Sequence, residues 1–149
     1  MENKDKVHEI LAQSYFFYFV FLLIGVVLDY VFPMQIFQNS IADSVGMILM
    51  IIATLLILWA QKTSRSLNKE NLNKRTFMSG PYKYTRSPTH WGLSILIFGF
   101  GITINAFFIV VTTVLSFFLT KMIFLKREEK ILTRKYGEPY KEYKKTVRL

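Results

Sequence analysis

Long apolar runs alternate with short polar segments along this chain. Residues 14–32 and 41–60 carry one charged side chain each, and residues 93–125 carry only Lys121. An α-helix rises 1.5 Å per residue, so about 20 residues cross a bilayer core of about 30 Å. The first two runs therefore predict one membrane-spanning helix each.

The third run would measure about 50 Å as one helix, which is too long for a single crossing. Gly99, Gly101 and Asn105 interrupt its apolar pattern and predict a turn. We therefore expect one all-α integral membrane domain with four transmembrane helices, a C-terminal helical hairpin and an amphipathic cytoplasmic tail. The predicted spans are about 14–32, 41–60, 89–104 and 106–125, and the tail is 126–149.

The charge distribution agrees with four spans. The formal net charge is +9, and all 19 lysines and arginines lie in the N-terminal segment, in residues 61–88 or from Lys121 onward. The two opposite loops carry none. Because basic residues favour cytoplasmic loops, the sequence predicts a multi-pass protein with both termini in the cytoplasm. No small-residue cleavage site follows the first run, so we interpret it as a retained span rather than a signal peptide.

Several classes of function fit the composition poorly. The chain has no cysteine and two histidines, which excludes disulfides and thiolate chemistry and argues against a metal site. The lysines flank apolar runs and form no separate soluble domain, so we expect the lipid bilayer as a partner and no nucleic acid.

The stretch "GPYKYTRSPTHWG", residues 80–92, places polar and aromatic groups just before the third run. Ser87 followed by Pro88 is typical of the start of a helix. The free amides of that start, with Arg86 beside them, would suit an anionic group such as a carboxylate. His90 falls in the first turn and could contact a polar ligand. The alternative is a capped helix whose Arg and Tyr side chains anchor it at the interface.

The C-terminal residues form a second polar group. Glu128 and Glu129 lie just beyond the last span, and only one of two adjacent helical residues can face a given pocket. Ordinary charge balance is the alternative for both. Apolar and aromatic residues of the tail recur on one helical face, which either lies on the membrane or closes over a pocket. That face consists of Leu132, Tyr136, Tyr140, Tyr143 and Val147.

Antiparallel packing of the hairpin would bring both polar groups to one cytoplasmic site. The two motifs together resemble the superfamily of isoprenylcysteine carboxyl methyltransferases and phospholipid N-methyltransferases, over roughly residues 77–149. The matching positions are Gly80, Pro81, Tyr82, Tyr84, Arg86, Pro88 and Gly92, then Glu128, Glu129, Leu132, Tyr136, Gly137, Tyr140 and Tyr143. This chain departs from the family pattern at Ser87, where His or Asn is usual, and at His90, where Tyr is usual.

The resemblance implies methyl transfer from S-adenosylmethionine to a membrane-partitioned acceptor, which is a prenylcysteine-like carboxylate, a lipid amine or a small apolar molecule. It implies Glu129 and Arg86 as catalytic residues, with Glu129 as the base if one is needed. The implied cofactor-binding residues are Tyr84, Arg86, Ser87, Pro88, His90, Trp91, Gly92, Glu128, Glu129, Tyr140 and Tyr143. A nicotinamide-dependent membrane reductase of the sterol-reductase type and a non-catalytic membrane module are the alternatives.

Overall fold

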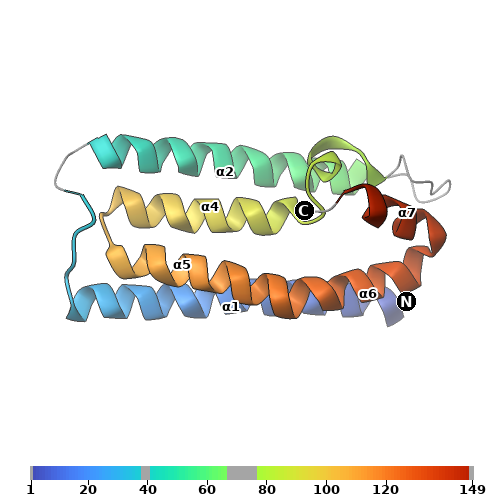
Figure 1. Ribbon diagram of the computed structural model, residues 1–149, viewed down its shortest axis with the longest axis horizontal. Coiled ribbons are helices and arrows are strands. Elements are labelled where there is room, and N and C mark those ends of the chain that lie inside the picture. Colours follow the sequence, from blue (N-terminus) through green and yellow to red (C-terminus); the bar gives the residue numbers. More distant parts are fainter. Residues whose placement is uncertain (1, 38–40, 67–76, 148–149) are drawn as a thin grey trace.

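Long helices make up most of the structure, a computed structural model that describes residues 2–37, 41–66 and 77–147, with only the backbone given for residues 2–8, 11 and 66. The helices run side by side along the long axis of the molecule (Figure 1). They are α1 (Glu2–Val31), α2 (Ile41–Ser66), α4 (Pro88–Thr103), α5 (Phe107–Thr120), α6 (Lys126–Tyr136) and α7 (Glu138–Thr146), with a 3₁₀ turn η1 (Gly80–Lys83) and a π-helical turn η2 (Lys121–Leu125).

Three helical stretches are long and apolar enough to cross a membrane: Ala12–Val31, Ile41–Arg65 and Phe107–Tyr136. The chain is therefore an all-helical integral membrane protein. Helix α4 has 16 residues, which is about 24 Å of helix and less than a bilayer core of about 30 Å. The fourth span accordingly stays a prediction.

The helical stretch that begins with α5 continues past residue 125, the predicted end of the last span. Helices α5 and α6 follow one another through η2 without leaving the helical region of φ and ψ. The π-helical turn absorbs the change in register between them. The helix stops at Gly137, whose φ of +64° is a conformation that glycine adopts at low cost.

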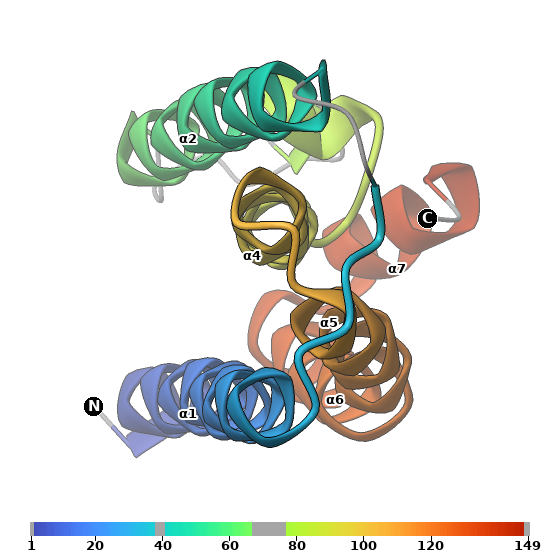
Figure 2. The same cartoon turned by 90° about the vertical axis from the view of Figure 1, so that its left-hand side faces the viewer.

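Small residues allow the helices to pack closely. Helix α4 lies between α2 and α5, and α5 lies against α1 (Figure 2). A Cβ atom added to Gly46 of α2 would lie 2.6 Å from the carbonyl oxygen of Gly99 in α4. A Cβ on Gly25 of α1 would lie 2.9 Å from the Cα of Ile109 in α5. Close backbone approach of this kind is typical of helix pairs in membranes.

Asp29 and Asn105 form the hydrogen bonds that connect the helices at the end of the bundle opposite the basic residues. Asp29 of α1 accepts hydrogen bonds from the amides of Phe108 (3.0 Å) and Ile109 (2.8 Å), the first turn of α5. Asn105, with φ of +56°, accepts from the amide of Phe37 (2.9 Å) and donates to its carbonyl (2.7 Å). These contacts tie the turn between α4 and α5 to the end of α1 and to the segment that follows it.

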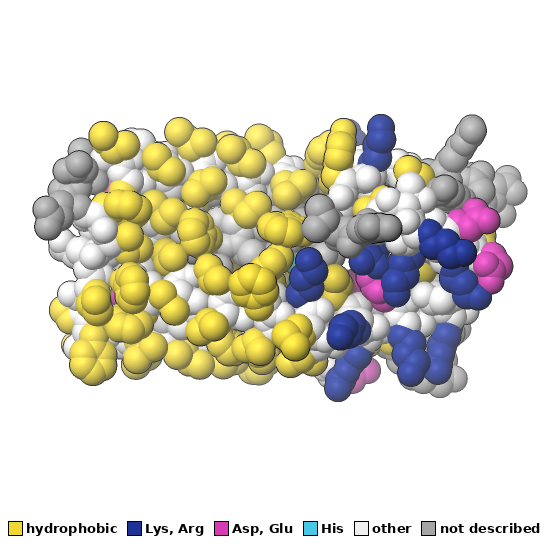
Figure 3. Space-filling model, viewed as in Figure 1, with side chains coloured by type: hydrophobic (Ala, Val, Ile, Leu, Met, Phe, Trp, Pro, Cys, Tyr) yellow, Lys and Arg dark blue, Asp and Glu magenta, His cyan; other side chains and the backbone are white. Residues whose placement is uncertain are grey.

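Side-chain types divide the surface into two zones. In Figure 3 hydrophobic side chains cover most of the length of the bundle, and charged side chains gather at one end. That end carries η1, the first turn of α4, α6 and α7 (Figure 1).

Candidate functional site at the charged end of the bundle

The segment that leads into α4 is shaped by its prolines and by Gly80. Gly80 has φ of +55°, and Pro88 occupies the first helical position of α4, where the missing N–H costs nothing. Ser87 is the N-cap residue, but its side chain makes no capping hydrogen bond. Its amide instead donates to the hydroxyl of Thr85 at 3.3 Å. This conformation places Arg86 immediately before the start of α4.

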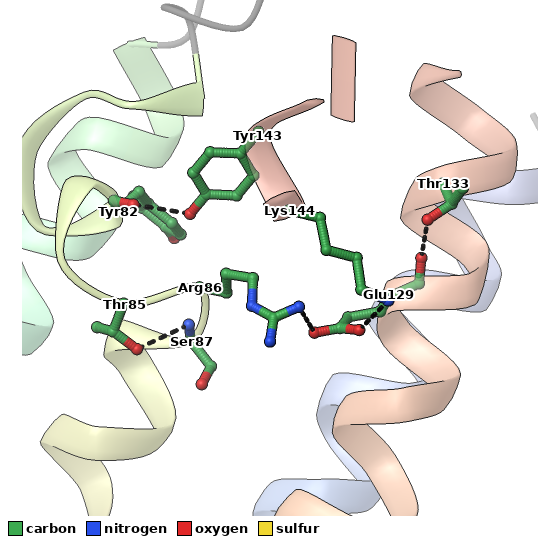
Figure 4. Close-up of polar contacts among 8 residues, drawn as sticks. All are labelled: Tyr82, Thr85, Arg86, Ser87, Glu129, Thr133, Tyr143 and Lys144. Carbon is green, nitrogen blue, oxygen red and sulfur yellow. Dashed lines mark hydrogen bonds and ion pairs between the residues drawn. The ribbon is translucent and has the colours of Figure 1, made fainter. Parts of the chain in front are cut away.

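Arg86 meets Glu129 of α6 directly. Its Nη1 lies 2.5 Å from Oε1 of Glu129, and both side chains are largely buried, with 15% and 12% exposed. Lys144 of α7 binds the other carboxylate oxygen, Oε2, at 2.5 Å. Figure 4 shows the three side chains converging from three segments of the chain. One carboxylate between two cations leaves a net positive charge at this point.

Glu128 faces a different partner from Glu129. Its Oε2 lies 3.7 Å from Nε2 of His90, whose side chain is 5% exposed. The neighbouring positions on α6 point about 100° apart, which explains why one glutamate meets Arg86 and the other meets His90. The site therefore contains two adjacent polar groups, the ion pairs of Glu129 and the contact between Glu128 and His90.

The aromatic face of the tail packs against the rest of the protein. Tyr143 donates a hydrogen bond of 2.7 Å from its hydroxyl to the carbonyl of Tyr82, which holds α7 over η1. This face therefore packs against η1 and the residues that precede it. Its cluster consists of Phe77, Tyr140, Tyr143 and Val147, with Met78, Tyr82, Leu132 and Tyr136 packed around it.

The environment of this cluster shifts the ionisation of its tyrosines. Burial raises the pKa of the Tyr143 hydroxyl above its usual value of 10, and Tyr82 and Glu129 add to the shift while Arg86 opposes it. Burial also raises the pKa of Tyr140, with further contributions from Glu129 and Glu128. Both hydroxyls are therefore neutral at any physiological pH.

A small cavity of about 10 Å³ adjoins His90, close to the least volume that one water molecule needs. It lies between the first turn of α4 and the end of α5. Its lining includes Tyr18, Ser87, His90, Trp91, Phe117 and Thr120.

Comparison with protein families decides the class of the protein. A family model described as phospholipid methyltransferase matches residues 41–139. The chain belongs to the phospholipid methyltransferase family. Searches of curated proteins and of solved structures gave no match.

The family match confirms the resemblance seen in the two motifs and extends it to α2. It supports a membrane methyltransferase and does not favour the nicotinamide-dependent reductase. The matched segment ends at residue 139, before Tyr140 and Tyr143. No group of three His, Cys, Asp or Glu side chains that could hold a metal ion occurs among residues 2–37, 41–66 and 77–147 as far as they are described.

The structure brings some of the expected site residues together and separates others. Tyr84 is 68% exposed and does not enclose the site. Gly92 faces α2, where an added Cβ would lie 2.5 Å from a side-chain atom of Ile57. Pro88 is buried and shapes the start of the helix. Those that meet are Arg86 with Glu129, His90 with Glu128, Ser87 and Trp91 with His90 around the cavity, and Tyr140 with Tyr143 in the aromatic cluster.

Sequence reasoning missed three residues of this region. Lys144 lies outside the aromatic face of the tail, yet it pairs with Glu129. Tyr18 and Thr120 line the cavity from apolar spans. Thr120 had a signal, because hydroxyl side chains recur at Thr112, Ser116 and Thr120, which is one face of an otherwise apolar helix.

Proposed function

We propose that this phospholipid methyltransferase family member transfers a methyl group from S-adenosylmethionine to an acceptor dissolved in the bilayer. The observation that carries the proposal is the meeting of Arg86, Glu129 and Lys144 at the charged end of the bundle. The family match supplies the class of reaction, and this cluster supplies charges that suit an amino-acid group.

We propose further that the chain crosses the membrane four times with both termini in the cytoplasm. The gathering of charged side chains at one end supports this orientation (Figure 3). Helix α4 lies alongside the longer helices, and Asn105 ties its far end to the segment after α1. A helix of about 24 Å can be accommodated by local thinning of the bilayer. Residues 1–149 then form a single membrane domain whose tail covers the cytoplasmic face.

The charges of the cluster match those of the proposed donor. The methionine part of S-adenosylmethionine carries a carboxylate and an ammonium group. Arg86 and Lys144 would hold the carboxylate, and Glu129 would hold the ammonium group. Arg86 and Glu129 bind each other in this structure, and the nearby cavity has room for about one water molecule. Binding of the donor therefore requires that the two side chains separate and that each forms an ion pair with the donor instead. The residues therefore fit the cofactor by charge.

When bound, the sulfonium of the donor supplies an electrophilic methyl group. The chain's own residues contribute position and exclusion of water, which account for much of the acceleration available to such a displacement. Tyr140 and Tyr143 lie on α7, the helix that also carries Lys144 of the ion pairs, and their rings can face a cation. The hydrogen bond from the Tyr143 hydroxyl to the carbonyl of Tyr82 holds α7 over η1.

The acceptor reaches this site from the bilayer. The apolar surface that covers most of the face seen in Figure 3 and adjoins the charged end supports a lipophilic molecule rather than a water-soluble one. We propose that the acceptor is a prenylcysteine-like carboxylate, a lipid amine or a small apolar molecule.

The test combines donor binding with methyl transfer by the purified, detergent-solubilised protein. We expect S-adenosylmethionine to bind in calorimetry, and Arg86→Ala and Glu129→Gln each to weaken binding by at least about tenfold, as expected when one partner of a charge-assisted contact is lost. Glu138→Gln is the matched control, because Glu138 forms an ion pair with Lys141 on the exposed side of α7. Binding of a nicotinamide cofactor in place of S-adenosylmethionine, or no donor binding by the unaltered protein, would refute the proposal.

A further inference from the structure

His90 is a buried side chain whose hydrogen-bonding capacity is unused. Neither ring nitrogen has a hydrogen-bond partner within the described part of the chain, and the residue is 4% exposed. Glu128 Oε2 is also buried without a hydrogen bond, and it lies 3.7 Å from Nε2 of His90. Buried polar groups are nearly always satisfied, so two that face each other at this distance need an explanation.

The surroundings of His90 suit a small reacting group. The ring borders the cavity, which has room for one small polar group and whose lining includes hydroxyl side chains. Tyr15 and Tyr18 of α1 also lie near the ring, at 6.0 and 6.2 Å between ring centroids. The charged side chains near His90 include Glu128 from α6 and Lys121 from η2.

Glu129 is less suited to accept a proton than the family resemblance suggested. Both of its carboxylate oxygens already hold a cation, Arg86 on one and Lys144 on the other. It could take a proton from an acceptor only after losing one of these ion pairs. His90 has two ring nitrogens open to a ligand and a carboxylate beside it.

Resting on the function proposed above, we propose that His90 is the catalytic base for an acceptor that carries a transferable proton on nitrogen or sulfur. The lone pair of the acceptor atom forms a bond to the donor's methyl group, and the sulfonium–methyl bond breaks with its electron pair left on sulfur. The acceptor's N–H or S–H bond breaks, and its proton goes to a ring nitrogen of His90. The positive charge of the sulfonium thus ends on the imidazolium, which faces Glu128.

Glu128 acts through His90 as a positioning residue and also selects the acceptor. A carboxylate stabilises a cation at this distance and repels an anion. An acceptor that reacts as a carboxylate would meet this repulsion and would need no base. The pair therefore favours an amine or a thiol on an apolar body over a prenylcysteine-like carboxylate.

The test supplies methyl-labelled S-adenosylmethionine to the full chain in lipid nanodiscs that contain dodecylamine, dodecanethiol, N-acetyl-S-farnesylcysteine and a total lipid extract. We expect the label in an N-methyl or S-methyl product. Removal of a general base typically costs about 10²–10⁴-fold in rate, so His90→Gln should lower kcat by that factor and leave the dissociation constant of the donor unchanged within about threefold. Added imidazole should restore part of the rate to His90→Ala.

The variant Glu128→Gln provides a second test, which does not depend on how well the histidine variants fold. The acid limb of its pH profile of kcat should move to lower pH, because the imidazolium loses its carboxylate partner. Glu142→Gln on α7, an exposed position, is the matched control and should leave the profile unchanged.

The outcomes separate this inference from the proposed function. If the unaltered protein does not bind the donor, both are wrong. If it binds the donor but labels only a methyl ester or no acceptor at all, the inference about His90 is wrong and donor binding stands. If an amine or thiol is methylated and His90→Gln keeps full kcat, the inference is likewise wrong.

Discussion

Replacing Glu129 by glutamine tests whether the central ion pairs hold the tail against the bundle. The change keeps the size of the side chain and removes its charge, which leaves Arg86 without its carboxylate in a largely buried position. A hydrogen bond to a charged group contributes about 1.5–3 kcal/mol, and removing one partner of a buried pair costs about 3–5 kcal/mol. Lys144 is 44% exposed, so water compensates for its loss and its share is small. We expect the free energy of unfolding to fall by about 2–3 kcal/mol.

The assay is thermal unfolding in detergent, followed by the fluorescence of the tryptophans. One kcal/mol corresponds to about 2–4 °C for a chain of this length, so Tm should fall by about 4–12 °C. Glu138→Gln, on the exposed side of α7, should leave Tm unchanged. The double variant Arg86→Gln with Glu129→Gln should recover part of the loss, because the two side chains contact each other directly and their effects couple.

A change in Tm no larger than that of the Glu138→Gln control would refute this reasoning. So would strict additivity of the Arg86→Gln and Glu129→Gln effects, since two residues in direct contact must couple. Either result would mean that the aromatic cluster alone holds the tail in place.

Three further predictions concern the architecture and are measured by unfolding in the same detergent. Asp29→Ala should lower the free energy of unfolding by about 1–3 kcal/mol, because it removes both hydrogen bonds to the first turn of α5. Asp29→Asn should lower it less, because the amide keeps one acceptor oxygen. Equal losses of stability in the two variants would contradict this. Gly46→Val should lower the free energy of unfolding by about 1–3 kcal/mol, because the added Cβ would lie 2.6 Å from the carbonyl oxygen of Gly99. An unchanged Tm would show that α2 and α4 can move apart at no cost in stability. The pKa of Tyr143 is raised in the folded state, so its neutral hydroxyl stabilises the fold fully below pH 10 and this contribution is lost as pH rises above 10. Tyr143→Phe should lower the free energy of unfolding by about 1 kcal/mol at neutral pH, because the hydrogen bond to Tyr82 is lost. The further decrease in stability above pH 10 should be smaller in this variant than in the unaltered protein. The same dependence of stability on pH in both proteins would contradict this.

Much of the architecture follows from local patterns in the chain. The apolar runs predicted membrane helices because a bilayer requires backbone groups to be satisfied within each segment. The turn near Asn105 was visible in the sequence, since few residues other than Gly and Asn adopt positive φ at low cost. The two motifs were sufficient to suggest the family that the family model confirmed.

Other features were decided only by packing. Helical periodicity does not show whether Glu128 or Glu129 meets Arg86, because this depends on the rotation of α6 against α4. Asp29 is the one charged residue of its apolar run, and only the packing of α5 against α1 brings the free amides of α5 to its carboxylate. Lys144 joined the site because α7 folds back after Gly137. Helical periodicity shows which residues share a face, but it carries no information about what that face contacts, because the partners come from segments distant in the chain.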